Sequence, residues 1–301
     1  MTEIRDKIQF LKKEKNALIL AHYYQTMDIQ VVADHVCDSF EMARLASMAS
    51  QSLLVICGVH FMAQSAKILN PAKTVLLPKL DSGCPMADGI SPEDVEKQRE
   101  LYPDAAIVCY INTSAAVKAV CDVCCTSSSA EKIVRALPEK RIIFVPDRNL
   151  GAYISSKVPE KEIIVFDGCC PVHDAITESD VLTAKKAHPG AKLLIHPECK
   201  MEVLQYADYI GSTAGIINEA LDSSADEFII GTETGVVERL CALAPGKTFH
   251  PLTNGFICHD MKKTRLTDVC DALESGRYEI SLADEEMIAA GKCLRRMIEI
   301  G

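Results

Sequence analysis

The sequence predicts an α/β protein built from three similar units of about 85 residues, each carrying a parallel β-sheet. Short runs rich in Val, Ile and Leu, typical of strands buried on both faces, alternate with helix-like stretches. The order and spacing of these runs repeat three times, and a cysteine falls at the same phase of every repeat. The chain has 301 residues, of which 48% are hydrophobic and 25% charged, a balance typical of an ordered globular protein.

Each predicted unit begins with an apolar run that ends at a polar residue, and these three end residues stand 88 and 86 residues apart. A second run ends 34 or 35 residues later, and a third, shorter run follows it. We predict strands at 17–22, 53–56, 74–77, 106–110, 142–145, 163–166, 192–196, 228–230 and 247–250. We predict helices at 3–15, 34–49, 64–69, 130–137, 201–207, 236–243 and 284–298.

The repeat divides the chain into predicted units at 1–86, 87–172 and 173–301, the last of which includes the C-terminal helix. No long linker or low-complexity segment separates them, so we expect the units to pack into one compact body.

The 14 cysteines are unusual in a chain whose first fifteen residues are charged and periodic rather than signal-like. We therefore expect a cytoplasmic protein with reduced cysteines, some of which bind metal. No apolar run reaches the roughly 18 residues of a membrane helix, so we expect no membrane partner. The net charge of −10 disfavours a nucleic-acid partner.

Three cysteines, Cys84, Cys170 and Cys258, follow a glycine-containing turn after the third run of each unit. They lie 62, 60 and 62 residues beyond the polar residue that ends the first run. Ligands of α/β sheets bind beyond the carboxyl ends of the strands, so we expect the three thiolates to converge. Three thiolates could bind a zinc ion, or they could bind three of the four irons of a cubane iron–sulfur cluster. In such a cluster the fourth iron has no protein ligand and can act as a Lewis acid.

Two alternatives remain open at this point. Cys169 neighbours Cys170 and satisfies the same spacing. The pair Cys121 and Cys124 forms a local CxxC motif, which could hold a structural zinc ion, although no second CxxC lies at zinc-site spacing.

Polar side chains also follow the first run of every unit. His22 is followed by Tyr24, Tyr110 by Asn112, and His196 by Glu198. Histidine, carboxylate and tuned tyrosine side chains can move protons near neutral pH, although each could instead be a hydrogen-bonded loop residue.

Hydroxyl-rich turns occur once in every unit and open a helix. They contain Ser39, then Ser127, and then Ser212 with Thr213. Hydroxyl groups together with helix N-terminal N–H groups bind carboxylate or phosphate, and helix capping is the competing role. The turn at 231–235 could be another anion site or a plain turn between strand and helix.

Several longer motifs fall in order along the chain. They are Ala21-His22-Tyr23-Tyr24-Gln25, Asp38-Ser39, Cys84-Pro85-Met86-Ala87, Tyr110-Ile111-Asn112-Thr113, Cys124-Cys125-Thr126-Ser127-Ser128, Gly168-Cys169-Cys170-Pro171-Val172-His173, His196-Pro197-Glu198-Cys199, Gly211-Ser212-Thr213, Gly231-Thr232-Glu233 and Cys258-His259-Asp260-Met261-Lys262. With these motifs the chain resembles the quinolinate synthase (quinolinate synthetase A) family from about residue 17 to 298. One departure is Ser128, where the family usually has asparagine.

The resemblance implies three pseudo-equivalent αβα domains with pseudo-threefold symmetry around a [4Fe–4S] cluster. It implies Cys84, Cys170 and Cys258 as the ligands, and so favours Cys170 over Cys169. The implied reaction is a transferase step of NAD biosynthesis, in which iminoaspartate condenses with dihydroxyacetone phosphate to give quinolinate, phosphate and two waters. Because iminoaspartate is unstable, the resemblance also implies functional coupling to an L-aspartate-oxidising enzyme.

The resemblance also implies roles for the polar residues. Glu198 is the expected base, Tyr110 its proton-transfer partner, and Tyr24 and His22 serve isomerisation and ring closure. The residues expected to bind substrate are His22, Ser39, Tyr110, Asn112, Ser127, His173, His196, Glu198, Ser212 and Thr213. His173 is also expected to lie near the cluster.

Two other functions remain in competition. The runner-up is an enzyme that resembles the diphosphate-reducing iron–sulfur enzyme of isoprenoid synthesis, which also uses three cysteines in three similar domains and requires an electron donor. A non-catalytic anion-binding or scaffold protein would bind ligands without consuming any of them.

Overall fold

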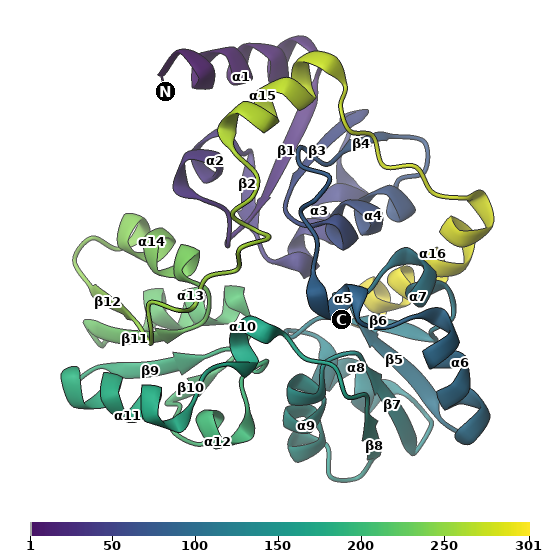
Figure 1. The fold of residues 1–301 in the computed structure, drawn as a ribbon, viewed down its shortest axis with the longest axis vertical. Helices are drawn as coiled ribbons and strands as arrows, with labels where there is room; N and C mark the ends of the chain where they lie inside the picture. The colour runs from purple at the N-terminus through teal and green to yellow at the C-terminus, as the bar shows by residue number, and fades with distance from the viewer. Residues whose placement is uncertain (1) are drawn as a thin grey trace.

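Three four-stranded parallel sheets organise residues 2–301, which are the residues that this computed structural model describes. Figure 1 shows the three α/β units grouped around a common centre, with the first at the top, the second at the lower right and the third at the lower left. The predicted α/β class and its parallel sheets are therefore confirmed. Each sheet lies within one predicted unit, whereas the boundaries at 86 and 172 remain predictions.

The first unit has the strand order β2-β1-β3-β4. All six residues of its first strand are buried, as a parallel strand covered by helices on both faces requires. The strands are β1 (Ala17–His22), β2 (His35–Cys37), β3 (Leu53–Cys57) and β4 (Thr74–Leu76). The helices are α1 (Thr2–Glu14), α2 (Met27–Val32), α3 (Ser39–Met48) and α4 (His60–Leu69).

The second unit repeats this topology with the order β6-β5-β7-β8. A capping box formed by Ser91 and Asp94, with Pro92 in the first turn, begins the helix that leads into its first strand. The strands are β5 (Ala106–Tyr110), β6 (Val123–Cys125), β7 (Arg141–Val145) and β8 (Glu162–Val165). The helices are α5 (Pro85–Asp88), α6 (Pro92–Leu101), α7 (Ala115–Ala119), α8 (Ala130–Ala136) and α9 (Arg148–Lys157).

The third unit has the order β10-β9-β11-β12. A second capping box, formed by Thr177 and Asp180, begins the equivalent helix before its first strand. The strands are β9 (Lys192–Ile195), β10 (Tyr209–Ile210), β11 (Glu227–Gly231) and β12 (Thr248–Pro251). The helices are α10 (Pro171–Asp174), α11 (Glu178–Ala187), α12 (Met201–Leu204), α13 (Thr213–Asp222) and α14 (Thr234–Leu243).

One aspartate occupies the same structural position in every unit. Its carboxylate accepts a hydrogen bond from the backbone N–H of a residue fifteen positions earlier, in the first strand of the unit. The pairs are Asp34 with Ile19 at 2.8 Å, Asp122 with Ile107 at 2.7 Å, and Asp208 with Leu193 at 2.7 Å. This shared contact joins the first strand of each unit to the start of the short strand that pairs with it, β2, β6 or β10. The three units therefore share a polar contact as well as the repeat of apolar runs.

The sequence interpretation was wrong about one of the two edge strands of every sheet, namely β2, β6 and β10. It predicted a continuous helix over 34–49, where the structure has β2 followed by α3, and it predicted no strand at β6 or β10. These three strands have only two or three residues, so no apolar run marks them. Each pairs along one side only, with the first strand of its unit.

The last two helices, α15 (Leu266–Ser275) and α16 (Asp284–Ile300), leave the third unit and return to the other two. Figure 1 shows α15 beside α1 at the top and the yellow α16 between the first and second units. The buried face of α16 contributes Ala290, Leu294 and Met297 to the core shared with α7 and β6. Chain order places the C-terminal helix with the third unit, whereas its apolar face packs on the first two.

Replacing Leu294 by alanine is expected to lower the free energy of unfolding by about 2–5 kcal/mol, because the side chain is fully buried. Urea denaturation measures this loss. Ile288→Ala on the same helix is the matched control, since that side chain is 61% exposed and its truncation should change little. Equal losses in the two variants would contradict the observed packing of α16.

No helix in residues 2–301 combines the length and the apolar character needed to span a membrane.

Candidate functional site

A cavity of about 390 Å³ lies where the three units meet, and its lining comes from all three of them. The first strand of each unit leads into it: His22 ends β1, Tyr110 ends β5, and His196 directly follows β9. The cavity therefore lies at the carboxyl ends of the parallel strands, where α/β sheets bind ligands.

Cys84, Cys170 and Cys258 all line this cavity, one from each unit. Cys84 and Cys170 are the N-cap residues of the short helices α5 and α10, each of which begins with proline. Cys169 is only partly buried and is not among the described residues that line the cavity. Of the adjacent pair, the turn that begins α10 therefore brings Cys170 and not Cys169 to the cavity lining.

Burial raises the pKa of the three thiols, to about 12 for Cys84, to about 11 for Cys258 and well above the usual range for Cys170. Backbone N–H groups in the turn after each cysteine act in the opposite direction, because they donate to the sulfur and favour the thiolate. These thiols stay protonated unless a positively charged metal group compensates the buried negative charge.

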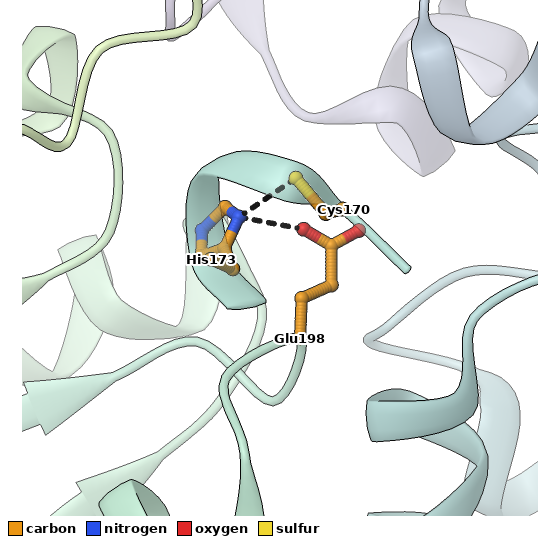
Figure 2. Close-up of side chains that lie close together, drawn as sticks. All are labelled: Cys170, His173 and Glu198. Atoms are coloured by element: carbon orange, nitrogen blue, oxygen red, sulfur yellow. Dashed lines mark hydrogen bonds and ion pairs between the residues drawn. The ribbon is translucent and has the colours of Figure 1, made fainter. Parts of the chain in front are cut away.

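His173 lies between the thiol of Cys170 and the carboxylate of Glu198. Its Nδ1 lies 3.2 Å from Cys170 Sγ and 3.0 Å from Glu198 Oε2, as Figure 2 shows. Cys170 caps the short helix α10 and His173 lies on it, whereas Glu198 comes from the loop after β9. Their ligand atoms all lie within 4.8 Å of one another, so this trio is also a possible metal-binding group.

Glu198 is a carboxylate at neutral pH. Burial alone would raise its pKa, but the neighbouring His173 and His196 outweigh burial and lower the pKa to about 2. Burial lowers the pKa of His196 itself to about 4, so this ring is neutral at pH 7. We therefore attribute the lowered pKa of Glu198 mainly to His173, the nearer of the two rings.

Three further titratable groups that line the cavity, His22, Tyr24 and Tyr110, are neutral near pH 7. Burial lowers the pKa of His22 to about 3. Burial, followed by the charge of Glu198, raises the pKa of both Tyr24 and Tyr110 well above the usual tyrosine range. The cavity thus brings the Glu198 carboxylate together with two tyrosine hydroxyl groups that remain able to donate a proton.

Two buried oxygen atoms in the cavity have no hydrogen-bond partner among residues 2–301. They are Oε1 of Glu198 and Oδ1 of Asn112. Leaving such an atom unpaired costs about 1–3 kcal/mol, so both atoms point to a ligand that supplies the missing donors.

Most of the residues predicted from the sequence to take part in catalysis or to bind substrate come together in this cavity. Those lining it are His22, Tyr24, Ser39, Tyr110, Asn112, Ser127, His173, His196, Glu198 and Thr213. Ser212 does not line it in the described chain; its side chain caps α13 by accepting from Gly215 N. Ser212 lines a neighbouring cavity of about 630 Å³, which shares Asp38, Phe40 and Ser127 with the first.

Thr232 was missed as a site residue. Its hydroxyl lies 2.8 Å from the Tyr24 hydroxyl and 3.0 Å from His173 Nε2, so it joins the first unit to the third. It belongs to the turn at 231–235, which the sequence marks as either an anion site or a plain turn. Side-chain hydrogen bonds between units leave no local signal in the sequence.

Lys262 and Glu233 form a second link between the first and third units that was missed. Lys262 Nζ lies 3.0 Å from Glu233 Oε1 and donates to the backbone oxygen of Tyr24 at 2.7 Å. Glu233 also accepts from the backbone N–H of Cys258 at 3.4 Å. The pair therefore holds the loop that carries Tyr24 against the turn that carries Cys258.

Comparison with known proteins points to one family over nearly the whole chain. The family described as "Quinolinate synthetase A protein" matches residues 6–299. The quinolinate synthase of Caldicellulosiruptor saccharolyticus is 51% identical over 298 residues, covering 99% of this chain and 98% of that protein. The quinolinate synthases of Thermodesulfovibrio yellowstonii and Clostridium perfringens (strain SM101) are each 46% identical, covering 98% and 99% of this chain and 97% and 99% of their own lengths.

Proposed function

Because this chain belongs to the quinolinate synthetase A family, we propose that its central cavity condenses iminoaspartate with dihydroxyacetone phosphate to form quinolinate. The reaction releases phosphate and two waters, and the protein is an enzyme of NAD biosynthesis that acts on small molecules. The observation that carries this proposal is the convergence of three cysteines and a set of proton-transfer groups, drawn from three units, on one cavity.

The donor set fits the iron–sulfur cluster that the family implies. Three soft thiolate donors face one cavity, and backbone N–H groups are placed to stabilise their charge. In the described chain, the three cysteines do not form a group whose sulfur atoms all lie within 4.8 Å of one another. One tetrahedral zinc ion would hold its sulfur ligands about 3.8 Å apart, so the wider spacing suits a polynuclear cluster better.

Cys84, Cys170 and Cys258 would therefore hold a [4Fe–4S] cluster at the centre of the three units. When bound, such a cluster supplies an open iron that acts as a Lewis acid toward a substrate oxygen. The remaining chemistry falls to the side chains of the chain itself.

Binding of the two anionic substrates rests on hydroxyl, amide and imidazole donors. Ser39 and Thr213 open the helices α3 and α13, so their hydroxyls lie beside helix N-terminal N–H groups, which favour carboxylate and phosphate. Ser127 lies 3.3 Å from His196 Nε2 and adds a third donor from the second unit. Asn112, His22 and His173 complete the proposed binding set, while Ser212 acts through its cap on α13.

Proton transfer centres on Glu198. Its carboxylate is ionised and has one free oxygen in the cavity, so it can accept a proton from a bound substrate. Tyr110 and Glu198 perturb each other's pKa, and the protonated tyrosine is placed to return that proton. Tyr24 and His22, whose rings meet edge to face at 4.5 Å, serve the later isomerisation and ring closure.

Supply of iminoaspartate is a further part of the proposal. This imine hydrolyses readily in water, so a reaction that oxidises the amine of L-aspartate must run close to the enzyme. We propose functional coupling to such an L-aspartate-oxidising enzyme.

Ser127→Ala is expected to raise KM about tenfold to a hundredfold with a smaller change in kcat, because one hydrogen bond to a charged substrate is lost. The measurement is the rate of quinolinate formation against substrate concentration. Ser128→Ala is the matched control, since Ser128 lines only the neighbouring cavity. Identical KM values for the two variants would contradict the proposed role of Ser127.

One experiment tests the proposed function directly. Anaerobically reconstituted protein, given dihydroxyacetone phosphate and iminoaspartate generated in place, should form quinolinate without any added reductant. A strict requirement for an electron donor would instead favour the diphosphate-reducing class of enzyme. Binding of both substrates without turnover would favour an anion-binding protein.

A further inference from the structure

A second group of metal-ligating side chains lies on the third unit, outside the central cavity. His188, Glu227 and His250 each offer one ligand atom, and the three atoms all lie within 4.8 Å of one another. Glu227 Oε1 lies 3.5 Å from His188 Nδ1 and 3.0 Å from His250 Nε2. The group is not among the residues that line either described cavity at the junction of the units.

The fold brings these residues together from three separate elements. Glu227 begins β11 and pairs with Thr248 of β12, so His250, two residues further along β12, extends on the same face of the sheet. His188 follows the last residue of α11 and ends that helix. The two imidazole rings stack with their centroids 3.5 Å apart and their planes inclined by 14°.

The carboxylate of Glu227 has no lysine or arginine partner in the described part of the chain; the ion pairs found for it are those to the two rings. The two rings stack face to face, so one of them would turn about its Cβ–Cγ bond to direct the in-plane lone pairs of both nitrogens at one ion. Neutral imidazole nitrogen and carboxylate oxygen are the donors that zinc and similar divalent ions take.

The distances match such an ion. A tetrahedral zinc ion with bonds of 2.0–2.2 Å holds neighbouring N and O ligands about 3.3–3.5 Å apart; the Glu227–His188 separation of 3.5 Å lies in this range and the Glu227–His250 separation of 3.0 Å lies just below it. The three side chains are 24–41% exposed, so an ion could enter from solvent and keep water in its remaining coordination positions.

The group is also remote from the reaction. Glu227 is the first residue of β11, whereas Thr232, which contacts Tyr24 and His173 of the central cavity, follows the last residue of this five-residue strand. At about 3.3 Å per residue, Glu227 and Thr232 lie roughly 16 Å apart.

We propose that His188, Glu227 and His250 form a site for a divalent transition-metal ion of the zinc class, separate from the three cysteines. The ion would join the end of α11 to the amino-terminal edge of β11 and β12. Its role is structural, because it clamps the third unit from the side opposite the cavity.

The test uses the cluster-loaded enzyme under anaerobic conditions, so that Cys84, Cys170 and Cys258 are occupied. The protein is given one equivalent of Zn²⁺, passed through a desalting column and examined by X-ray absorption at the zinc edge. We expect about one retained zinc per chain, with nitrogen and oxygen neighbours at about 2.0–2.2 Å rather than sulfur at about 2.3 Å. This readout is specific for zinc and does not depend on turnover.

The variants His188→Ala, His250→Ala and Glu227→Gln should each retain at least tenfold less zinc while forming quinolinate at the parent rate. His35→Ala is the matched control, because His35 is an exposed histidine on β2 of the first unit, and it should retain zinc like the parent. Zinc bound mainly to sulfur, no zinc retained by the parent, or unchanged retention in all three variants would each overturn the proposal.

Discussion

Cys170→Ala is expected to yield a protein that is colourless after anaerobic reconstitution and forms no quinolinate, whereas Cys169→Ala keeps both cluster and activity. Cys170 lines the central cavity and is the N-cap residue of α10, while its neighbour lies outside the lining in the described chain. A three-ligand cluster that loses one thiolate is left with too few ligands to persist. Iron analysis of the parent should give about four irons per chain.

The adjacent pair makes this comparison unusually strict, because the two variants differ only in which of two consecutive thiols is removed. Cys84→Ala and Cys258→Ala should behave like Cys170→Ala. Cys241→Ala, which removes an exposed thiol on α14, should behave like the Cys169 variant. Retention of a four-iron cluster by Cys170→Ala, or its loss in Cys169→Ala, would rule out the proposed ligand set.

Glu198→Gln is expected to lower kcat about 10²- to 10⁴-fold, the range typical for removal of a general base. Glutamine keeps the shape of the side chain but cannot accept a proton from the substrate. Oε1 of Glu198 is the free carboxylate oxygen in a cavity whose tyrosines are protonated and whose His22 and His196 are neutral near pH 7. Kinetic measurement on protein of matched iron content checks this.

Glu202→Gln is the control for that substitution, because Glu202 is exposed on α12, four residues further along the chain. It should leave kcat unchanged. An iron content that falls together with kcat in Glu198→Gln would mean that the carboxylate supports the cluster through His173 instead. A kcat within tenfold of the parent would exclude Glu198 as the base.

The repeat predicted most of the sheet structure because a strand that is buried on both faces consists almost entirely of apolar residues, and such a run is visible in the sequence. All nine predicted strands are present, each shifted by at most one residue at either end. The edge strands β2, β6 and β10 escaped prediction because two or three residues form too short a pattern. Their positions depend on pairing with the neighbouring strand and on the carboxylates of Asp34, Asp122 and Asp208.

The candidate site was predictable for a related reason. Residues at the ends of equivalent strands share a phase in the repeat, and this shared phase is enough to group His22, Tyr110 and His196. Glu233 could not be grouped in this way, because it acts through an ion pair with Lys262. Neither could Thr232 and Lys262, because they act through hydrogen bonds between units. Their partners are residues of the distant first unit, such as Tyr24, and no spacing records that proximity.

By itself the sequence determined the α/β class, the threefold repeat and the phase of the three cysteines, because apolar periodicity and strand-end positions are local properties. The tertiary structure alone decided how those parts meet. It placed α16 on the first two units, directed Cys170 into the cavity beside His173, and brought His188 to Glu227 and His250. Contacts of this kind form when separate apolar faces pack together, and packing joins residues that lie far apart in the chain.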